Sequence, residues 1–197
     1  FIRSRLMEHK FNPEDKKKLF SELRKKALPA HKTLKETGLK EGMNFADIGC
    51  GNGYFTFPAS GITGPKGRVF ALDISPEMLE EINARVKEEN KTNIEVINTE
   101  ENNLKIAKES VDLAFSCNVV HEAKDLDLFL KEVERILRPG GRIAIIDWEK
   151  KDSDLGPPRE HRLDKSIIIN ELKNIGFKYI KAKNLNKDLY RIIAIKN

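Results

Sequence analysis

The feature that most constrains the fold of this chain is a glycine-rich stretch, FADIGCGNGYF, at residues 45–55. Three glycines, at positions 49, 51 and 53, follow a short apolar run that carries one acid, Asp47. Glycine adopts backbone conformations that other residues avoid, and it lets the main chain approach a ligand closely. A strand that leads into such a loop and then into a helix predicts an α/β fold with a ligand above the loop.

Strand and helix patterns alternate along most of the chain. The predicted strands are 44–48, 68–74, 94–98, 111–116, 142–147, 179–182 and 189–195. The predicted helices are 14–27, 30–37, 53–60, 76–90, 126–137 and 165–175. Strands that alternate with helices form a mainly parallel, doubly wound sheet. We therefore expect a seven-stranded α/β sheet, closed by a hairpin of the last two strands.

The expected layout is one domain over residues 1–197, with an N-terminal helical arm or cap at 1–38. A ligand-binding core covers 43–147, and a loop, a helix and the terminal hairpin cover 148–197. No apolar run approaches the roughly 18–20 residues that span a bilayer, so we expect no membrane partner. The two cysteines, Cys50 and Cys117, suit neither a disulfide framework nor a zinc cluster. We expect no metal and a reducing, cytoplasmic location.

The positive charge of the chain is concentrated at its N-terminal end. Residues 1–40 hold 12 Lys and Arg against 5 acids, whereas residues 41–197 hold 24 against 26. Such an arm could contact RNA or an anionic substrate, or it could be the solvated face of a helix. Both interpretations stay open on the sequence alone.

The spacing of the glycines narrows the class of ligand. A phosphate-binding Walker loop is excluded, because Tyr54 follows the last glycine and no Lys-Ser/Thr pair is present. A dinucleotide loop would place its third glycine at position 54 rather than 53. Asp73, at the end of the next strand, can accept hydrogen bonds from a ribose. Asp47 would repel a pyrophosphate but favours a ligand with an ammonium group. S-adenosylmethionine, with adenosine at one end and an amino acid at the other, meets both requirements.

Four segments carry a family resemblance: ADIGCGNGYF, ALDIS, VDLAFSCNVVHE and RILRPGGRIAIIDW. Together they resemble the class I S-adenosylmethionine-dependent methyltransferases. They are most similar to the small branch that includes the menaquinone- and ubiquinone-biosynthesis methyltransferases. The resemblance covers about residues 43–147. It implies a Rossmann-like methyltransferase fold and S-adenosyl-L-methionine as the cofactor.

The resemblance also implies which residues contact the cofactor. They are Asp47, Gly49, Gly51, Gly53, Asp73, Ile74, Glu100, Glu101 and Asn118. The glycines lie under the methionyl part, where Asp47 meets the ammonium directly or through water and the backbone of Asn118 makes a further contact. Asp73 binds the ribose diol, with Ile74 against the adenine. Glu100 takes the exocyclic amine, and Glu101, which replaces a usual small residue, contributes its backbone N–H.

Methyl transfer needs alignment of acceptor, methyl and sulfur, and a general base only if the acceptor loses a proton. His121, just after the fourth strand, is the candidate base for a phenol or enol oxygen, although it could equally cap or pack a helix. Glu122 suits the first turn of a helix. Trp148 could stack on a flat acceptor or close the core. His161 could line a lid or lie in solvent.

Three functions remain compatible with the sequence. The first is methyl transfer to a small-molecule acceptor, without an arsenite-type thiol relay, because only two cysteines are present. The second is methyl transfer to RNA or protein through the basic arm. The stretch SCNVV lacks the proline-containing signature for planar amines, which disfavours those acceptors. The third is a non-catalytic module that binds S-adenosylmethionine or NAD. The sequence specifies neither the acceptor nor the oligomeric state.

Overall fold

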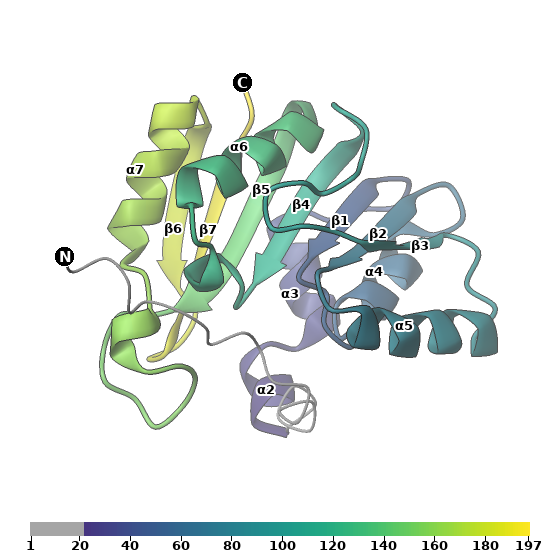
Figure 1. Cartoon of the computed structure of the whole chain (residues 1–197), viewed down its shortest axis with the longest axis horizontal. Helices are drawn as coiled ribbons and strands as arrows, with labels where there is room; N and C mark the ends of the chain where they lie inside the picture. The colour runs from purple at the N-terminus through teal and green to yellow at the C-terminus, as the bar shows by residue number, and fades with distance from the viewer. Residues whose placement is uncertain (1–21) are drawn as a thin grey trace.

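The computed structural model describes residues 22–197, and its centre is one seven-stranded sheet (Figure 1). The strand order is β3-β2-β1-β4-β5-β7-β6. The strands are β1 (Asn44–Ile48), β2 (Arg68–Asp73), β3 (Ile94–Asn98), β4 (Val111–Cys117), β5 (Leu137–Trp148), β6 (Lys178–Asn184) and β7 (Leu189–Ile195). Neighbouring strands are parallel except β7, which is antiparallel to both β5 and β6. The predicted doubly wound sheet with a terminal hairpin is confirmed.

Helices cover both faces of this sheet. The helices α3 (Ala30–Thr37), α4 (Thr56–Thr63) and α5 (Pro76–Glu88) supply apolar residues to the core on one face. The helices α6 (Leu126–Ile136) and α7 (Lys165–Ile175) pack against β5 and β7 on the other face. The first described helix, α2 (Glu22–Ala27), is the end of the predicted helix 14–27. Residues 1–21 of the predicted arm lie outside the described residues.

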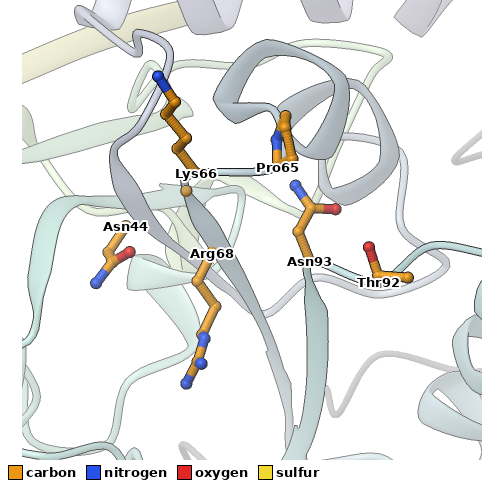
Figure 2. A pocket seen from close by; sticks show the side chains of 7 residues that line it. Asn44, Pro65, Lys66, Arg68, Thr92 and Asn93 are labelled. Carbon is orange, nitrogen blue, oxygen red and sulfur yellow. The ribbon is translucent and has the colours of Figure 1, made fainter.

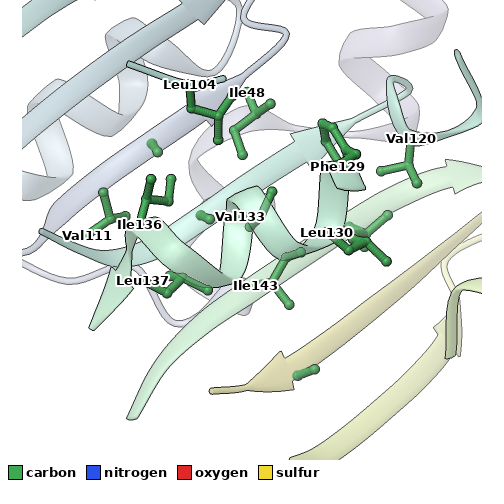
Figure 3. Close-up of a cluster of buried hydrophobic side chains, with 14 of the residues drawn as sticks. Ile48, Leu104, Val111, Val120, Phe129, Leu130, Val133, Ile136, Leu137 and Ile143 are labelled. Atoms are coloured by element: carbon green, nitrogen blue, oxygen red, sulfur yellow. The ribbon is translucent and has the colours of Figure 1, made fainter. Parts of the chain in front are cut away.

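Alternation along the central strands places apolar side chains in a core on each face. In β1, Phe45 packs on the α3–α4 side, whereas Ala46 and Ile48 join the cluster under α6 (Figure 3). Strands buried on both faces are typical of a parallel sheet flanked by helices. The helix α6 contributes Phe129 and Val133 to the second cluster. The two cores hold the carboxyl ends of the strands in a fixed arrangement.

Capping residues explain where several helices begin and end. Asp125 accepts a hydrogen bond from the backbone N–H of Leu128 at 3.0 Å, at the start of α6. Ser75 accepts one from Met78 at the start of α5. Side-chain oxygens satisfy the free N–H groups of a first helical turn. Gly38 and Gly176 end α3 and α7 in the left-handed conformation, with φ of 95° and 106°.

Among the described elements after α2, α4 and β5 differ from the sequence prediction by three or more residues at a boundary, and the others by at most two. The helix α4 begins at Thr56 rather than Gly53, because Gly53 has a φ of 82°, which is incompatible with a right-handed helix. The strand β5 begins at Leu137 rather than Arg142, because Leu137 pairs with Val111 before an irregularity in the ladder. Within residues 22–197, no helix is both long enough and apolar enough to cross a membrane.

Candidate active site

The carboxyl ends of four adjacent strands gather the predicted site residues at one edge of the sheet. Asp47 lies near the end of β1, Asp73 ends β2, Asn118 follows β4, and Asp147 lies near the end of β5. In Figure 1 the strands β4 and β5 point toward the lower edge, where α2 and the loop after β5 also lie. Ligands of doubly wound sheets bind at this edge.

The glycine loop after β1 has the backbone geometry that its sequence predicts. Gly49, Gly51 and Gly53 all have positive φ, at 67°, 53° and 82°. The N–H groups of Gly49 and Cys50 both donate to the carbonyl of Leu72 in β2, at 2.8 and 3.0 Å. A Cβ on Gly49 would lie 2.3 Å from Cγ2 of Val119, so a larger residue would push the loop off the segment after β4. The loop is thereby fixed against both neighbouring strands.

The carboxylate of Asp73 is built into this loop. It accepts hydrogen bonds from the N–H groups of Gly51 and Ser75, each at 2.9 Å. Burial raises the pKa of Asp73, and these backbone hydrogen bonds act in the opposite direction. Each carboxylate oxygen keeps a lone pair for a further donor, as a ribose diol requires. The next residue, Ile74, is 54% exposed, which leaves its apolar surface available to a ligand.

Several buried polar atoms near the loop have no hydrogen-bond partner among the described residues. Nδ2 of Asn52, Oδ1 of Asn118 and Oγ of Ser116 are buried, and none of them has a hydrogen-bond partner among residues 22–197. Asn118 also has a φ of 59°, which is uncommon for a residue with a side chain. Native proteins leave few buried polar groups unpaired. A ligand with an amino-acid end supplies both a donor and an acceptor, so the site fits the expected cofactor.

The remaining predicted cofactor residues have partners of their own in this structure. Asp47 is 3% exposed, and its carboxylate accepts a hydrogen bond from the hydroxyl of Thr56 at 2.7 Å. The carboxylate of Glu100 lies 3.2 Å from Lys105, and its side chain is 69% exposed. The carboxylate of Glu101 accepts a hydrogen bond from the N–H of Lys124. Contact of these three residues with a cofactor stays a prediction.

His121 forms a tightly hydrogen-bonded pair with Asp147. Its Nδ1 lies 2.7 Å from Oδ1 of Asp147, and its backbone N–H donates to Oδ2 at 3.1 Å. Burial lowers the pKa of His121, but the hydrogen bond and charge of Asp147 outweigh it, so the pKa is raised. When Nδ1 donates its proton to the carboxylate, Nε2 of the neutral ring is the acceptor. That is the arrangement of a general base.

Glu122 adds a second titratable group at the same place. Its Oε1 lies 3.9 Å from Nε2 of His121. Burial raises the pKa of Glu122 to about 7; His121 acts against this shift, while Asp147 and Asp73 reinforce it. A histidine and a glutamate with raised pKa values thus lie together at the carboxyl edge, and shifted pKa values of this kind are common at catalytic sites.

The loop after β5 contains the site residue that the sequence did not reveal. Arg162, in the stretch GPPREHR, is 1% exposed and lies over the ring of Trp148 at 5.4 Å. Trp148 packs against the core on the α3–α4 side, so its contacts match the prediction that it closes the core edge. His161 ends a short 3-10 helix, η3 (Arg159–His161). No sequence pattern distinguishes Arg162 from the exposed arginines of the chain.

The two cysteines lie close to the site but do not form a metal or thiol centre. Cys50 and Cys117 are free and buried. Burial raises the pKa of Cys50 well above its ordinary value, and the charges of Asp47 and Asp73 add to the effect. A thiolate is therefore strongly disfavoured at Cys50. Within residues 22–197, no cluster of His, Cys, Asp and Glu has an arrangement suited to a metal ion.

A cavity of about 430 Å³ lies at the opposite edge of the sheet (Figure 2). Its lining includes Asn44 and Arg68, which begin β1 and β2, and Asn93, which precedes β3. The Nδ2 group of Asn93 already donates to the carbonyls of Ser60 and Gly64. None of the titratable or unpaired polar groups described above lines this cavity. We therefore place the candidate site at the carboxyl edge of the sheet and not in this cavity.

Comparison with known proteins agrees with the class of cofactor that the sequence predicts. A family model described as a methyltransferase domain matches residues 39–196. The chain is similar to the crystal structure of a SAM-dependent methyltransferase from Aquifex aeolicus, with a TM-score of 0.89 and 33% sequence identity. That similarity covers 95% of this chain and 100% of the other.

Curated relatives match somewhat more than half of the chain. A demethylmenaquinone methyltransferase from Lactococcus lactis is 39% identical over 116 residues, which is 59% of this chain and 46% of that protein. An arsenite methyltransferase from Halobacterium salinarum is 36% identical over 106 residues, which is 54% of this chain and 27% of that protein. The matched segments thus span less than half the length of these two curated relatives.

Proposed function

The chain belongs to the methyltransferase-domain family, the class I S-adenosylmethionine-dependent methyltransferases, and on this premise we propose that it methylates a small organic acceptor that loses a proton. The observation that carries the proposal is the hydrogen bond between His121 and Asp147 at 2.7 Å. Such a pair suits an acceptor that must lose a proton, because the carboxylate orients the imidazole and stabilises its protonated form. We further propose that residues 1–197 act as one domain, with the cofactor site in residues 43–147.

We propose that the cofactor lies along the carboxyl edge from β2 to β4. Asp73 would hold the ribose, with Ile74 beside the adenine and Glu100 and Glu101 at its edge. The glycine loop, Asp47 and Asn118 would hold the methionyl end, together with Asn52, whose buried Nδ2 lacks a partner among the described residues. When bound, S-adenosylmethionine supplies an activated methyl group. The chain itself aligns the acceptor with that group and excludes water.

His121 would then remove the acceptor proton. Asp147 orients the imidazole through Nδ1 and stabilises the positive charge that the ring acquires. Asp147 is itself held by the N–H groups of His121 and Trp148, at 3.1 and 2.8 Å, so the pair is fixed before any acceptor binds. A pre-oriented base lowers the barrier for an acceptor whose hydroxyl or ring carbon must lose a proton.

A quinol-like ring is the acceptor class that fits these observations best. The Lactococcus lactis relative is named as a demethylmenaquinone methyltransferase, and a quinol loses a proton when it is methylated. The similarity to an arsenite methyltransferase gives weaker guidance, because Cys50 and Cys117 are buried and a thiolate at Cys50 is strongly disfavoured. An RNA or protein acceptor rests only on the basic N-terminal residues, and NAD binding is disfavoured by Asp47 beside the glycine loop.

The proposal is tested by methyl transfer from labelled S-adenosylmethionine to a demethylated naphthoquinol under anaerobic conditions. We expect His121→Asn to lower kcat/KM by about 100-fold, within the usual range for loss of a general base. Because the base form of the imidazole is active, the wild-type rate should rise as pH passes through the His121 pKa. That limb should vanish in the variant.

The matched control is His31→Asn, on the exposed surface of α3. It should leave both the rate and its pH dependence unchanged. Wild-type protein that binds S-adenosylhomocysteine but methylates no quinol would contradict the proposed acceptor class. An unchanged pH limb in the His121 variant would contradict the role of the base.

A further inference from the structure

The most unusual side chain near the site is the buried guanidinium of Arg162. Its recorded hydrogen bonds go to three backbone carbonyls, those of Glu149, Leu155 and Pro157. The contacts to Glu149 and Pro157 measure 3.1 and 2.8 Å. Burying a guanidinium against neutral carbonyls costs hydration free energy, and an exposed arginine does not lose this hydration. The position of Arg162 therefore calls for a role beyond loop closure.

Arg162 joins the two ends of the segment 149–162. Glu149 begins this segment directly after β5, and Leu155 and Pro157 lie near its middle. Between them, Gly156 has a φ of 78°, and a Cβ there would lie 2.6 Å from the ring of Trp148. The segment thus rests directly on Trp148, and neither a side chain nor a change of backbone direction is tolerated at Gly156.

The same arginine stands behind the proposed base. Trp148, over whose ring Arg162 lies, donates its backbone N–H to Asp147, the partner of His121. The charged groups that act on His121 come from three elements: Asp147 from β5, Glu122 from the short helix η2 (Val120–Glu122), and Arg162 from the loop. Burial lowers the pKa of His121, the two acids raise it, and the charge of Arg162 lowers it again. Arg162 therefore opposes the two carboxylates.

We propose that Arg162 is a positioning residue of the acceptor side, which holds segment 149–162 as a wall on Trp148 and places a positive charge behind the His121–Asp147 pair. The inference rests on the proposed function for its catalytic meaning, and on contacts alone for its structural part. The wall keeps water from one side of the pair. The charge keeps the imidazole closer to its neutral, base-competent form.

The test uses four variants of the full chain. Arg162→Met removes the charge and the donors. Arg162→Lys keeps the charge, but its donors all lie on one nitrogen, whereas the three carbonyls are held by three different nitrogens of the guanidinium. Gly156→Ala is expected to push segment 149–162 away from the ring of Trp148, and this variant retains the Arg162 side chain. The matched control is Arg159→Met in the same loop, whose side chain is 58% exposed.

Two readouts need no methyl acceptor. Trp148 is the only tryptophan of the chain, so its emission and its quenching by acrylamide report on the wall alone. The pKa of His121 is read by NMR titration with S-adenosylhomocysteine bound, and the His121→Asn spectrum assigns the signal. Both are measured on samples whose circular dichroism matches that of the wild type.

We expect Arg162→Met to shift the Trp148 emission to longer wavelength, to increase its quenching, and to raise the His121 pKa by about half a unit, because a nearby positive charge is lost. Arg162→Lys and Gly156→Ala should expose Trp148 while the His121 pKa stays near the wild-type value. The Arg159 control should match the wild type in both readouts.

Wild-type quenching and wild-type His121 pKa in Arg162→Met would overturn the inference. If Arg162→Met does not fold, the lysine and alanine variants decide, and unchanged quenching in both would overturn it. Failure of the proposed function is a separate result, since it appears as absence of methyl transfer by the wild type. The two readouts above do not depend on that reaction.

Discussion

Glu122 shows how one side chain can tie stability to pH. Its pKa is raised to about 7, first by burial and then by the charges of Asp147 and Asp73, whereas an ordinary glutamate titrates at 4.5. The folded state therefore binds this proton more tightly than the unfolded chain does. The protonated Glu122 side chain therefore stabilises the folded state relative to the unfolded chain. This contribution is fully present below about pH 4.5 and is lost as pH rises through about 7.

We expect Glu122→Gln to flatten the pH dependence of the free energy of unfolding between pH 5 and 8. Because 35% of the side chain is exposed, solvent screening reduces the effect, and the gain at pH 8 should be about 1 kcal/mol. Urea unfolding at four or five pH values measures it. Glu80→Gln, on the exposed side of α5, is the control and should run parallel to the wild type.

Single residues of the site divide into those with a sequence signal and those without one. The three glycines and Asp73 were predictable, because backbone geometry and a ribose partner each require a particular residue type at a particular spacing. His121 was predicted as a base, and its partner Asp147 ends a predicted strand. Asn52 and Arg162 carry no such signal, because an asparagine or arginine in a loop is ordinarily solvated. Only the folded chain shows that both are buried.

The helix α6 depends on the far end of the chain for its C-terminal cap. Nζ of Lys196, which follows β7, donates to the carbonyls of Glu134 and Leu137 at 2.9 and 2.8 Å. It also forms an ion pair with the carboxylate of Glu134 at 3.0 Å. The carbonyl of Glu134 also accepts the backbone N–H of Leu137, so the ammonium adds a second donor there, and its positive charge complements the helix dipole.

We expect Lys196→Met to destabilise the fold by about 1–3 kcal/mol, because charged hydrogen bonds to two carbonyls and an ion pair with Glu134 are lost at a buried position. Thermal and urea unfolding give the value, and hydrogen exchange should show the loss at the end of α6. Lys187→Met, in the exposed turn before β7, should have almost no effect. Equal stability of the two variants would exclude this role of Lys196.

The elements themselves were largely predictable, and their ends were not. The strands of the parallel part stand out because both faces are buried, so their sequences are continuous apolar runs. The boundary of α4 moved because Gly53 serves the loop and not the helix. The segment Pro139-Gly140-Gly141 follows the end of α6 and lies within β5, between Leu137 and Arg142, which both pair with β4.

We expect the two edges of the sheet to differ in role, with ligand binding at the carboxyl edge and structural support at the amino edge. One variant at each edge tests this expectation. Asp73→Asn at the carboxyl edge should weaken binding of S-adenosylhomocysteine by about 10- to 100-fold, since hydrogen bonds to a charged acceptor are lost. Asn93→Ala at the amino edge should leave the affinity unchanged. It should instead lower the stability by about 1–3 kcal/mol, because its side chain links Ser60, Thr63 and Gly64.

Calorimetry and urea unfolding of both variants separate these effects. Weaker ligand binding in the Asn93 variant, at matched folded fraction, would contradict the assignment of the cavity in Figure 2 to a structural role. The topology was predictable from the alternation of strands and helices, and so was the edge of the sheet at which we place the candidate site. The proposed acceptor class was not, because no periodicity specifies the conformation of segment 149–162. The location in the cell stays a prediction.

The hydrogen bond from the N–H of Gly51 to Asp73 has a thermodynamic consequence. The loop proposed to hold the methionyl end and the carboxylate proposed to hold the ribose are fixed by one another. A ligand fragment that orders the loop also orders the carboxylate, and the reverse holds as well. The second fragment to bind therefore causes a smaller loss of conformational entropy, and the effect is reciprocal. Adenosine and methionine offered as separate molecules should therefore enhance each other's binding. The site recognises its cofactor as one object rather than as two halves.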